Sequence, residues 1–281
     1  MLETRFVTPD RARTADLVAA ALRDAGEHAA PASWQWIEHG SANLVVLAGS
    51  AAVRVGRTAA ASAESIRAQQ LVDDLPVFPF AVPRSLGEPH RDGDLVAIAQ
   101  RRVDGIPHPS GHGDPDALGT LVDALAEVPV GPREPHLATP HAFMGGDRWH
   151  AVMLEQAIPL LDRATRDRAR EAADALAALE PVRAGLVHGD LAGSNVLWNN
   201  GVVSGVIDWD LASTGDPAVD IAALAVWHGW DALERVRPRD VIARARVIAA
   251  THPLQVLCFS IVNERPESER RRAAEWASSR M

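Results

Sequence analysis

The stretch that decides the fold of this 281-residue chain is LVHGDLAGSNVL, residues 186–197. Asn195 follows Asp190 within it, and Asp208 comes later, at the end of a predicted strand over residues 202–207. A carboxylate such as Asp190 can accept the proton of an attacking hydroxyl. Asn195 and Asp208 can offer the hard oxygen ligands that Mg²⁺ prefers. These groups fit phosphoryl transfer, which needs positioned oxygens and neutralised phosphate charge more than covalent work by the protein.

Each of these residues also has a simpler interpretation. Isolated Asp and Asn side chains commonly close turns, and for Asp190 or Asn195 alone that interpretation would be preferred. The order of several blocks along the chain decides between the two. The blocks are His188-Gly189-Asp190, Asn195, Ile207-Asp208-Trp209, Gly215-Asp216-Pro217 and Asp220. One His-Gly-Asp would be a weak signal, whereas ordered blocks around a predicted hairpin are specific.

This ordered set resembles the aminoglycoside phosphotransferase family, which includes macrolide phosphotransferases and lies within the protein-kinase-like superfamily. The resemblance implies that Asp190 is the catalytic base and that Asn195 and Asp208 are Mg²⁺ ligands. It also implies ATP or GTP as co-substrate and a hydroxyl of a small molecule as acceptor. An aminoglycoside or macrolide antibiotic is the expected kind of acceptor.

Other residues of the blocks are expected to support the catalytic loop rather than to react. The resemblance implies that His188 packs and hydrogen-bonds to hold the loop. Asp216 is expected to cap the helix that begins at Pro217, and Asp220 to brace the loop from inside that helix.

The resemblance implies an α+β, bilobal protein-kinase-like fold, and the local patterns agree with it. Residues 1–102 are strand-rich and are expected to form the nucleotide-binding lobe. Residues 103–281 should form a mainly helical lobe with the catalytic loop and the acceptor site. Strands are predicted at 44–48, 52–55, 94–99, 195–198 and 202–207, the last two joined by a tight turn at Asn200-Gly201. Helices are predicted at 9–25 with Thr8 as cap, 59–71, 149–161, 165–179, 217–230, 239–250 and 267–278, with others starting at Asp116 and passing through Val256.

A short turn between two predicted strands is the candidate phosphate-binding loop. Its sequence, HGSAN at residues 39–43, has one glycine and is similar to the Gly-Ser-x-Asn turns of small-molecule kinases in this superfamily. Backbone amides and the Ser41 hydroxyl could contact phosphate there, with Asn43 beside them. An ordinary hairpin turn fits this segment almost as well when it is read alone.

The next strand places Arg54 where protein kinases have a lysine, and Glu64 is its expected partner. Arginine can serve at such a position because it is always charged and binds phosphate through a planar fork, although it does not simply replace lysine. The alternative is an Arg that faces solvent on an edge strand. Further on, backbone groups near Gln100 and Arg102 are expected to bind the purine edge at the hinge between lobes.

The acceptor site is the least defined part of the sequence. Asp210, Asp231 and Glu264 are candidate carboxylates for a cationic amine. Trp227 and Trp230 lie three residues apart on a predicted helix and fit an apolar wall of the site. They fit a hydrophobic core equally well.

Composition excludes some classes of protein. The net charge of −9 and the isoelectric point near 5.6 argue against nucleic-acid binding, which needs a surplus of Lys and Arg. One cysteine, Cys258, cannot form an internal disulfide. No stretch has the length of apolar sequence that crosses a bilayer, and no secretory signal is expected. The expected location is the cytoplasm, without a membrane partner, and the sequence leaves the oligomeric state open.

Other functions compete with antibiotic modification. A metabolic kinase acting on an amino alcohol or a sugar would use the same catalytic residues. A catalytically silent, kinase-like nucleotide-binding protein would agree with Arg54 and the single glycine of the loop, but it need not keep Asp190, Asn195 and Asp208. A metal-dependent hydrolase is disfavoured because no further His or carboxylate cluster has ligand spacing near His188.

Overall fold

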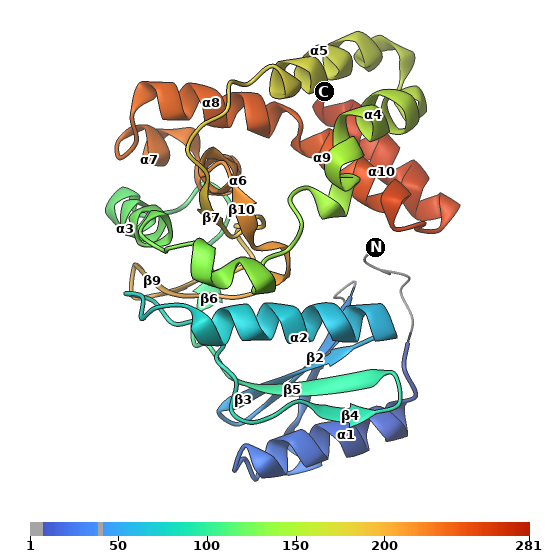
Figure 1. Ribbon diagram of the computed structural model, residues 1–281, viewed down its shortest axis with the longest axis vertical. Helices are drawn as coiled ribbons and strands as arrows, with labels where there is room; N and C mark the ends of the chain where they lie inside the picture. The colour runs from blue at the N-terminus through green and yellow to red at the C-terminus, as the bar shows by residue number, and fades with distance from the viewer. Residues whose placement is uncertain (1–7, 39–41) are drawn as a thin grey trace.

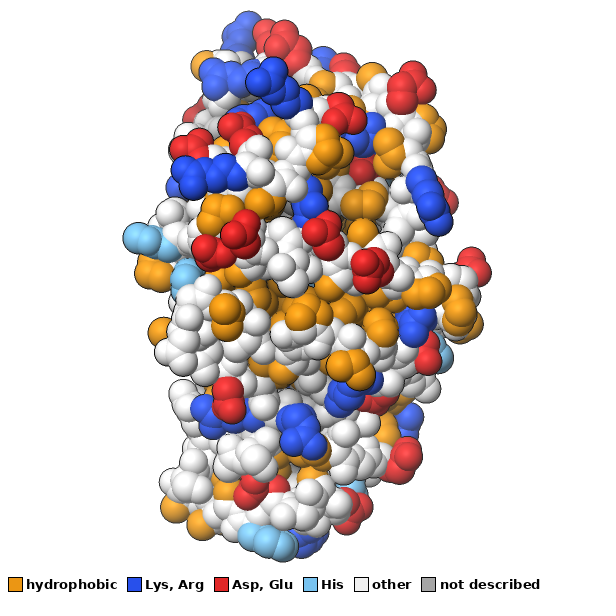
Figure 2. Space-filling model, turned by 90° about the vertical axis from the view of Figure 1, so that its left-hand side faces the viewer, with side chains coloured by type: hydrophobic (Ala, Val, Ile, Leu, Met, Phe, Trp, Pro, Cys, Tyr) orange, Lys and Arg blue, Asp and Glu red, His pale blue; other side chains and the backbone are white. Residues whose placement is uncertain are grey.

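The computed structural model describes residues 8–38 and 42–281, which fold into two lobes, one above the other in Figure 1. The lower lobe contains an antiparallel sheet with a helix on each face, and the upper lobe is mainly helical. On the face shown in Figure 2, apolar side chains cross the middle of the molecule, between charged side chains above and below them.

The N-terminal sheet has five strands in the order β1-β2-β3-β5-β4. They are β1 (Gln35–Ile37), β2 (Asn43–Ala48), β3 (Ala51–Gly56), β4 (His90–Asp92) and β5 (Leu95–Arg101). Alternate residues such as Val53 and Val55 form one buried face and pack against α1 (Arg11–Asp24). Arg54, between them, faces the side of α2 (Ala59–Asp74) and the other lobe. This alternation is what directs Arg54 toward Asp210 of the other lobe.

The start of α1 differs from the expectation. The helix begins at Arg11 rather than Pro9, and its cap is Asp10 rather than Thr8, because the Asp10 carboxylate accepts a hydrogen bond from the Arg13 amide at 2.8 Å. Either residue type can cap a helix, and Asp is at least as favourable as Thr. The second helix begins at Ala59, as predicted, behind a Thr58 cap.

The C-terminal lobe combines helices with short strand pairs. The helices are α3 (Pro115–Ala126), α4 (Trp149–Val152), α5 (Arg166–Ala177), α6 (Ala218–His228), α7 (Trp230–Glu234), α8 (Arg239–Ala250), α9 (His252–Val262) and α10 (Glu267–Arg280). The strands are β6 (Ile106–Pro107), β7 (Gly185–Val187), β8 (Val196–Asn199), β9 (Val202–Val206) and β10 (Ser213–Gly215). The β8–β9 hairpin is the predicted one, and positive φ angles of 50° at Asn200 and 80° at Gly201 give its primed turn.

Two predicted helices are interrupted. Residues 149–161 are not one α-helix but the short α4, a π-turn over Met153–Ala157 and a 3₁₀ turn over Ile158–Leu160. Gly229, with φ of 100°, ends α6 and separates it from α7, so the predicted helix over 217–230 is two helices. Trp227 and Trp230 therefore do not share a helix face.

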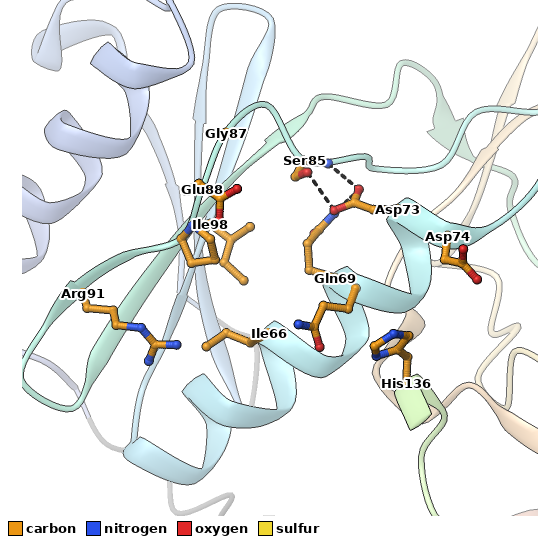
Figure 3. A pocket seen from close by; sticks show the side chains of 12 residues that line it. Ile66, Gln69, Asp73, Asp74, Ser85, Gly87, Glu88, Arg91, Ile98 and His136 are labelled. Carbon is orange, nitrogen blue, oxygen red and sulfur yellow. Dashed lines mark hydrogen bonds between the residues drawn. The ribbon is translucent and has the colours of Figure 1, made fainter. Parts of the chain in front are cut away.

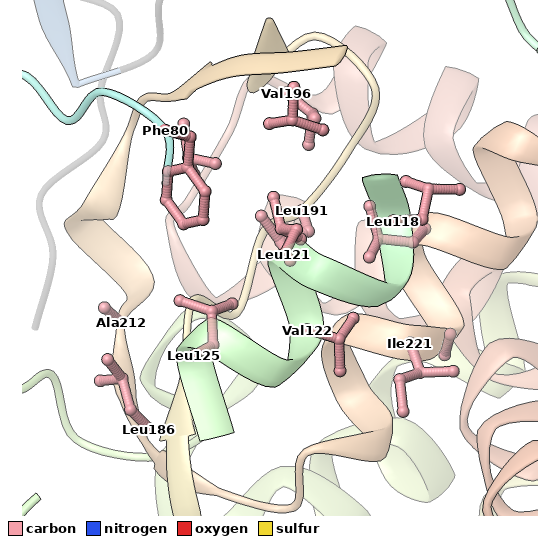
Figure 4. Close-up of a cluster of buried hydrophobic side chains, with 14 of the residues drawn as sticks. Phe80, Leu118, Leu121, Val122, Leu125, Leu186, Leu191, Val196, Ala212 and Ile221 are labelled. Atoms are coloured by element: carbon pink, nitrogen blue, oxygen red, sulfur yellow. The ribbon is translucent and has the colours of Figure 1, made fainter. Parts of the chain in front are cut away.

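The largest hydrophobic core lies in the C-terminal lobe. It also includes Phe80 and Val82, from the segment between α2 and β4. Phe80 and Val82 pack there with α3 residues such as Leu121 and Leu125 (Figure 4). Ala81 donates its amide to Ser204 O and accepts from the Val206 amide, both at 2.9 Å. This crossing segment holds β9, and therefore the loop that follows it, against the N-terminal part of the chain.

Among the helices of residues 8–38 and 42–281, none is by itself long and apolar enough to cross a membrane. The pair α8 and α9, bent by 44°, has the length and composition only when the two helices are taken together.

Candidate active site

His188 anchors the catalytic loop directly after β7. Its backbone N–H and that of Gly189 donate to the Asp220 carboxylate of α6 at 2.7 and 2.9 Å. Its ring Nε2 lies 3.0 Å from Ile207 O and its Nδ1 accepts from the Asp190 amide at 3.2 Å, which fits a neutral ring protonated on Nε2. Burial lowers the pKa of His188 to about 4. These contacts agree with the predicted supporting role of His188, which stays a prediction.

Asp216 and Asp220 sit at the start of α6, where the sequence placed them. The helix begins at Ala218 rather than at the predicted Pro217, and Asp216, two residues earlier, accepts from the Ala218 amide at 2.9 Å and pairs with Arg244. Burial raises the pKa of Asp220 to about 6, although the two backbone donors oppose this rise. The Asp220 carboxylate, in the first turn of α6, therefore holds the backbone at the start of the loop through His188 and Gly189.

Asp190 and Asn195 face each other within the loop. The Asn195 amide Nδ2 donates to Asp190 O at 2.9 Å and to Asp190 Oδ2 at 3.0 Å. Burial and the nearby Asp208 carboxylate raise the pKa of Asp190 to about 7, while the hydrogen bond from Asn195 lowers it. A carboxylate with such a pKa suits proton acceptance near neutral pH.

Asp208 follows β9, with Ile207 between them. It has a left-handed backbone with φ and ψ both 65°, which is uncommon for a residue other than glycine and concentrates at functional sites. Half of its side-chain surface is exposed. Desolvation by the surrounding chain and the neighbouring Asp210 carboxylate raise the pKa of Asp208 to about 6, against the lowering effect of Arg54.

The oxygen atoms at this point fit Mg²⁺. Because Asn195 directs its Nδ2 toward Asp190, its Oδ1 is left for a cation, with only the Ser194 hydroxyl at 3.4 Å. Asp210 Oδ1 is buried and has no hydrogen-bond partner in residues 8–38 and 42–281. The described chain contains no group of three or more His, Cys, Asp or Glu arranged around a metal position. A few oxygen ligands that leave room for phosphate and water are what Mg²⁺ requires.

The predicted pair of Arg54 and Glu64 is wrong. Arg54 Nη2 lies 2.6 Å from Asp210 Oδ2 and 3.5 Å from Asp208 Oδ1. Glu64 instead accepts a hydrogen bond from Arg67 Nε at 2.8 Å, one turn along α2. Arg54 is therefore buried in the cleft, and the alternative of a solvent-facing Arg is excluded as well.

Asn43 belongs to the same cluster. Its Nδ2 donates to Asp210 Oδ2 at 3.1 Å, and its Oδ1 accepts from the Ser65 hydroxyl at 2.7 Å. Both ends of this side chain are thus bonded within the protein. Ser41 lies outside the described residues, so its contact with phosphate stays a prediction.

The hinge residues have partly different partners from those expected. The Gln100 side chain is buried and donates to Gln69 of α2, and its backbone pairs with Ala52 of β3 on one side and with Ser85 on the other. The Arg102 amide donates to Ser50 O at 2.9 Å in the β2–β3 turn. That amide is therefore already used, and the expectation that it binds the purine edge is wrong for this donor.

The candidate acceptor residues do not form one site. Asp210 lies in the Arg54 cluster rather than on an acceptor wall, which corrects its assignment. Trp227 packs on the catalytic loop at Gly193 and donates from Nε1 to His108 O at 3.0 Å. Trp230 lies under the Arg246 guanidinium, 4.2 Å from the ring centroid.

Asp231 and Glu264 are both exposed, and they lie far apart. Asp231 is in α7, whereas Glu264 follows the end of α9, and Figure 1 shows these helices on different sides of the lobe. The acceptor roles of Trp227, Asp231 and Glu264 stay predictions.

Sequence reasoning missed Arg67 and the real role of Asp210. Arg67 Nη2 donates to Asp210 O at 2.7 Å and its Nη1 to His136 O at 2.6 Å. These contacts join residues up to 143 positions apart, so no local pattern indicates them. The position of Asp210, two residues after Asp208 in the same loop, was the available signal.

A cavity of about 620 Å³ lies elsewhere, beside α2 (Figure 3). Gln69, Asp73, Ser85, Glu88 and Arg91 are among its lining residues. Asp73 accepts hydrogen bonds from Ser85 and Gln69, so its oxygens are engaged in the fold. The catalytic residues do not line this cavity.

Solved structures with the same architecture were found. A GDP complex of aminoglycoside 2'-phosphotransferase-IIIa superposes with a TM-score of 0.79 at 17% identity, over 96% of this chain and 98% of that one. A macrolide 2'-phosphotransferase of Brachybacterium faecium gives a TM-score of 0.70 at 20% identity, over 92% and 96%. These likenesses confirm the bilobal, protein-kinase-like α+β fold. The fold therefore places the chain among proteins with a kinase-like, two-lobed architecture.

The family follows from the sequence itself. The chain belongs to the phosphotransferase enzyme family, whose model matches residues 33–257. It is also similar to the viomycin phosphotransferase of Streptomyces vinaceus, with 46% identity over 82 residues. That match covers 28% of this chain and 29% of the relative, so less than a third of the curated protein is matched.

Proposed function

We propose that this chain transfers the γ-phosphoryl group of ATP or GTP to a hydroxyl of a small-molecule antibiotic. The observation that carries the proposal is the contact of Asp190 with Asn195, close to the Asp208 carboxylate. Family membership and the names of the relatives support the antibiotic as acceptor.

The residues divide the chemistry as follows. Asp190 takes the proton of the acceptor hydroxyl while the hydroxyl oxygen forms a bond to the γ-phosphorus. The bond from that phosphorus to the β–γ bridging oxygen breaks, and the nucleoside diphosphate leaves with the electron pair. Asn195 holds the Asp190 carboxylate in position through its Nδ2. Mg²⁺, when bound by Asn195 and Asp208, neutralises charge on the phosphates.

A screen of hydroxylated antibiotics tests the proposal. The protein is incubated with Mg²⁺, ATP or GTP, and one candidate at a time from the aminoglycoside, macrolide and viomycin-like classes. Mass spectrometry should show the addition of one phosphoryl group to at least one candidate. The Asp190→Asn variant is the control, and it should give no product in the same time.

A second arm of the screen uses amino alcohols and sugars in place of antibiotics. Phosphorylation of one of these, with none of any antibiotic, would replace the proposal with a metabolic kinase. Nucleotide binding without phosphorylation in either arm would favour a silent nucleotide-binding protein.

A further inference from the structure

We infer that Asp210, and not Glu64, is the counter-ion that positions Arg54 over the nucleotide phosphates, and that it ties the N-terminal lobe to the metal-binding loop. The inference rests on the proposed function and goes beyond it. It assigns the positioning of Arg54 to Asp210, whereas the sequence pattern predicts Glu64 of α2 for this role.

The contacts of the Asp210 carboxylate carry the inference. Its Oδ2 is shared by Arg54 Nη2 at 2.6 Å and by Asn43 Nδ2 at 3.1 Å. The side chains of Arg54 and Asp210 are 12% and 18% exposed, so water screens this ion pair weakly. β2, β3 and the loop after β9 therefore meet at one carboxylate oxygen.

The backbone of Asp210 makes a second connection, to α2. Its carbonyl oxygen accepts from Arg67 Nη2 at 2.7 Å, and the same guanidinium donates to Glu64 and to His136 O. Glu64 thus contacts Arg67, and it is connected to Arg54 only indirectly, through Arg67 and Asp210. Loss of Glu64 leaves both contacts of Asp210 with the N-terminal strands in place.

Arginine, rather than lysine, suits this arrangement. The guanidinium is planar and has several donors, so one group can bind Asp210 Oδ2 while it approaches Asp208 Oδ1 at 3.5 Å. The ammonium group of a lysine is a single compact charge on a flexible stem. Arg54 is thereby held beside the carboxylate that is expected to bind Mg²⁺.

A double-mutant cycle tests the inference. The dissociation constant of a fluorescent ADP analogue with Mg²⁺ is measured for the wild type, Asp210→Asn, Arg54→Gln, the double variant and Glu64→Gln. Asp210→Asn should weaken binding about tenfold, a typical coupling for a close charged pair. In the Arg54→Gln background the same change should matter less than about twofold, because the pair is already lost. Glu64→Gln should weaken binding less than about threefold, as expected for an indirect contact.

Several results would overturn the inference. One is a larger loss of affinity for Glu64→Gln than for Asp210→Asn, and another is an effect of Asp210→Asn that is equal in both backgrounds. If the wild type binds no nucleotide, the proposed function fails. The free energy of unfolding by urea is then measured for the same four proteins of the cycle. Additive effects of the two substitutions on that free energy would contradict the coupling of Arg54 and Asp210. Coupling in the cycle without phosphorylation of any acceptor would keep the inference and reject the proposed function.

Discussion

At the scale of single residues, charge is concentrated at one point of the cleft. The carboxylates of Asp208 and Asp210 raise the pKa of Asp190, and the carboxylate of Asp210 raises the pKa of Asp208. Arg54 balances part of this negative charge. Like charges held together in a cleft destabilise the protein unless a cation joins them, so the cluster favours the binding of a divalent metal.

Replacement of Asp190 tests the base. Asp190→Asn keeps the size of the side chain but removes the proton acceptor, so the rate of transfer should fall by about 10²–10⁴-fold, the usual contribution of general-base catalysis. The nucleotide dissociation constant should stay within about threefold of wild type, because Asp190 faces the acceptor rather than the nucleotide. Single-turnover kinetics and titration of the ADP analogue give the two quantities. An undiminished rate would remove Asp190 from the mechanism.

Replacement of Asp208 tests the metal. ATP with Mg²⁺ should raise the melting temperature of the wild type, since a ligand that binds only the native state stabilises it. Removal of Mg²⁺ by EDTA should abolish most of this rise. Asp208→Asn should show little rise in either condition, while Asp190→Asn should still show the Mg²⁺-dependent rise. A rise that is indifferent to Mg²⁺ in the wild type would contradict the metal role of Asp208.

At the scale of elements, the catalytic loop is positioned by its neighbours as much as by its own sequence. Asp220 of α6 holds the backbone at His188, and Trp227, two turns further along α6, packs against Gly193. The loop is therefore fastened to the same helix near both of its ends. Changes in α6 should act on catalysis without touching a reacting group.

Asp220→Ala should destabilise the protein by about 2–4 kcal/mol. The change leaves the buried N–H groups of His188 and Gly189 without their acceptor, and an unsatisfied buried donor costs about 1–3 kcal/mol. Urea denaturation gives the free energy of unfolding. The exposed Asp231→Ala is the matched control and should change it by less than about 0.5 kcal/mol. Equal effects of the two variants would show that the loop does not depend on this carboxylate.

Gly193→Ala should disturb the same loop from its other end. A Cβ at residue 193 would lie 1.9 Å from Trp227 Cε2, well inside contact distance, so the indole or the loop has to move. We expect a lower rate of transfer and a lower melting temperature. Trp227→Leu in the same chain makes room for the methyl group and should restore part of both. A Gly193→Ala protein with wild-type rate and stability would contradict the tight contact.

Elements with strong local signals could be predicted from the sequence, and contacts between distant segments could not. The β8–β9 hairpin follows from the tight turn predicted at Asn200-Gly201, and the start of α2 at Ala59 agrees with the helix predicted over 59–71. The catalytic loop was found through its ordered blocks. The partner of Arg54 was missed because it lies 156 residues away, and α4 was overextended because a π-turn keeps much of the helical pattern.

At the scale of the whole molecule, the lobes are joined by more than the hinge. The segment at Ala81 pairs with β9, and Arg67 and Arg54 reach across from the N-terminal lobe to Asp210. Burial of polar and charged groups is the common feature of these contacts. The stability of the fold should accordingly depend on pH through groups whose protonation differs between the native and unfolded states.

Two sets of buried groups act on that dependence with opposite sign. Asp190 and Asp220 have raised pKa values of about 7 and 6, so the native state binds their protons first, and acidification from about pH 7 toward 4 stabilises it. Burial lowers the pKa of His188 and of His252 to about 4. These rings stay neutral in the native state while the unfolded chain takes up protons, so they cost stability as the pH falls from about 6.5 to 4.

His252→Gln separates one of these effects, because His252 lies in the first turn of α9 and outside the active-site cluster. The variant cannot take up a proton on unfolding, so between about pH 7.5 and pH 5 it should lose about 1–2 kcal/mol less stability than the wild type. Urea denaturation at both pH values measures the difference. His28→Gln, at an exposed position, is the control and should follow the wild type. Suppose instead that the free energy of unfolding of His252→Gln changes with pH in parallel with that of the wild type. The His252 imidazole would then be as solvated in the native state as in the unfolded chain, and the packing of α9 would contribute nothing to the acid sensitivity of the protein.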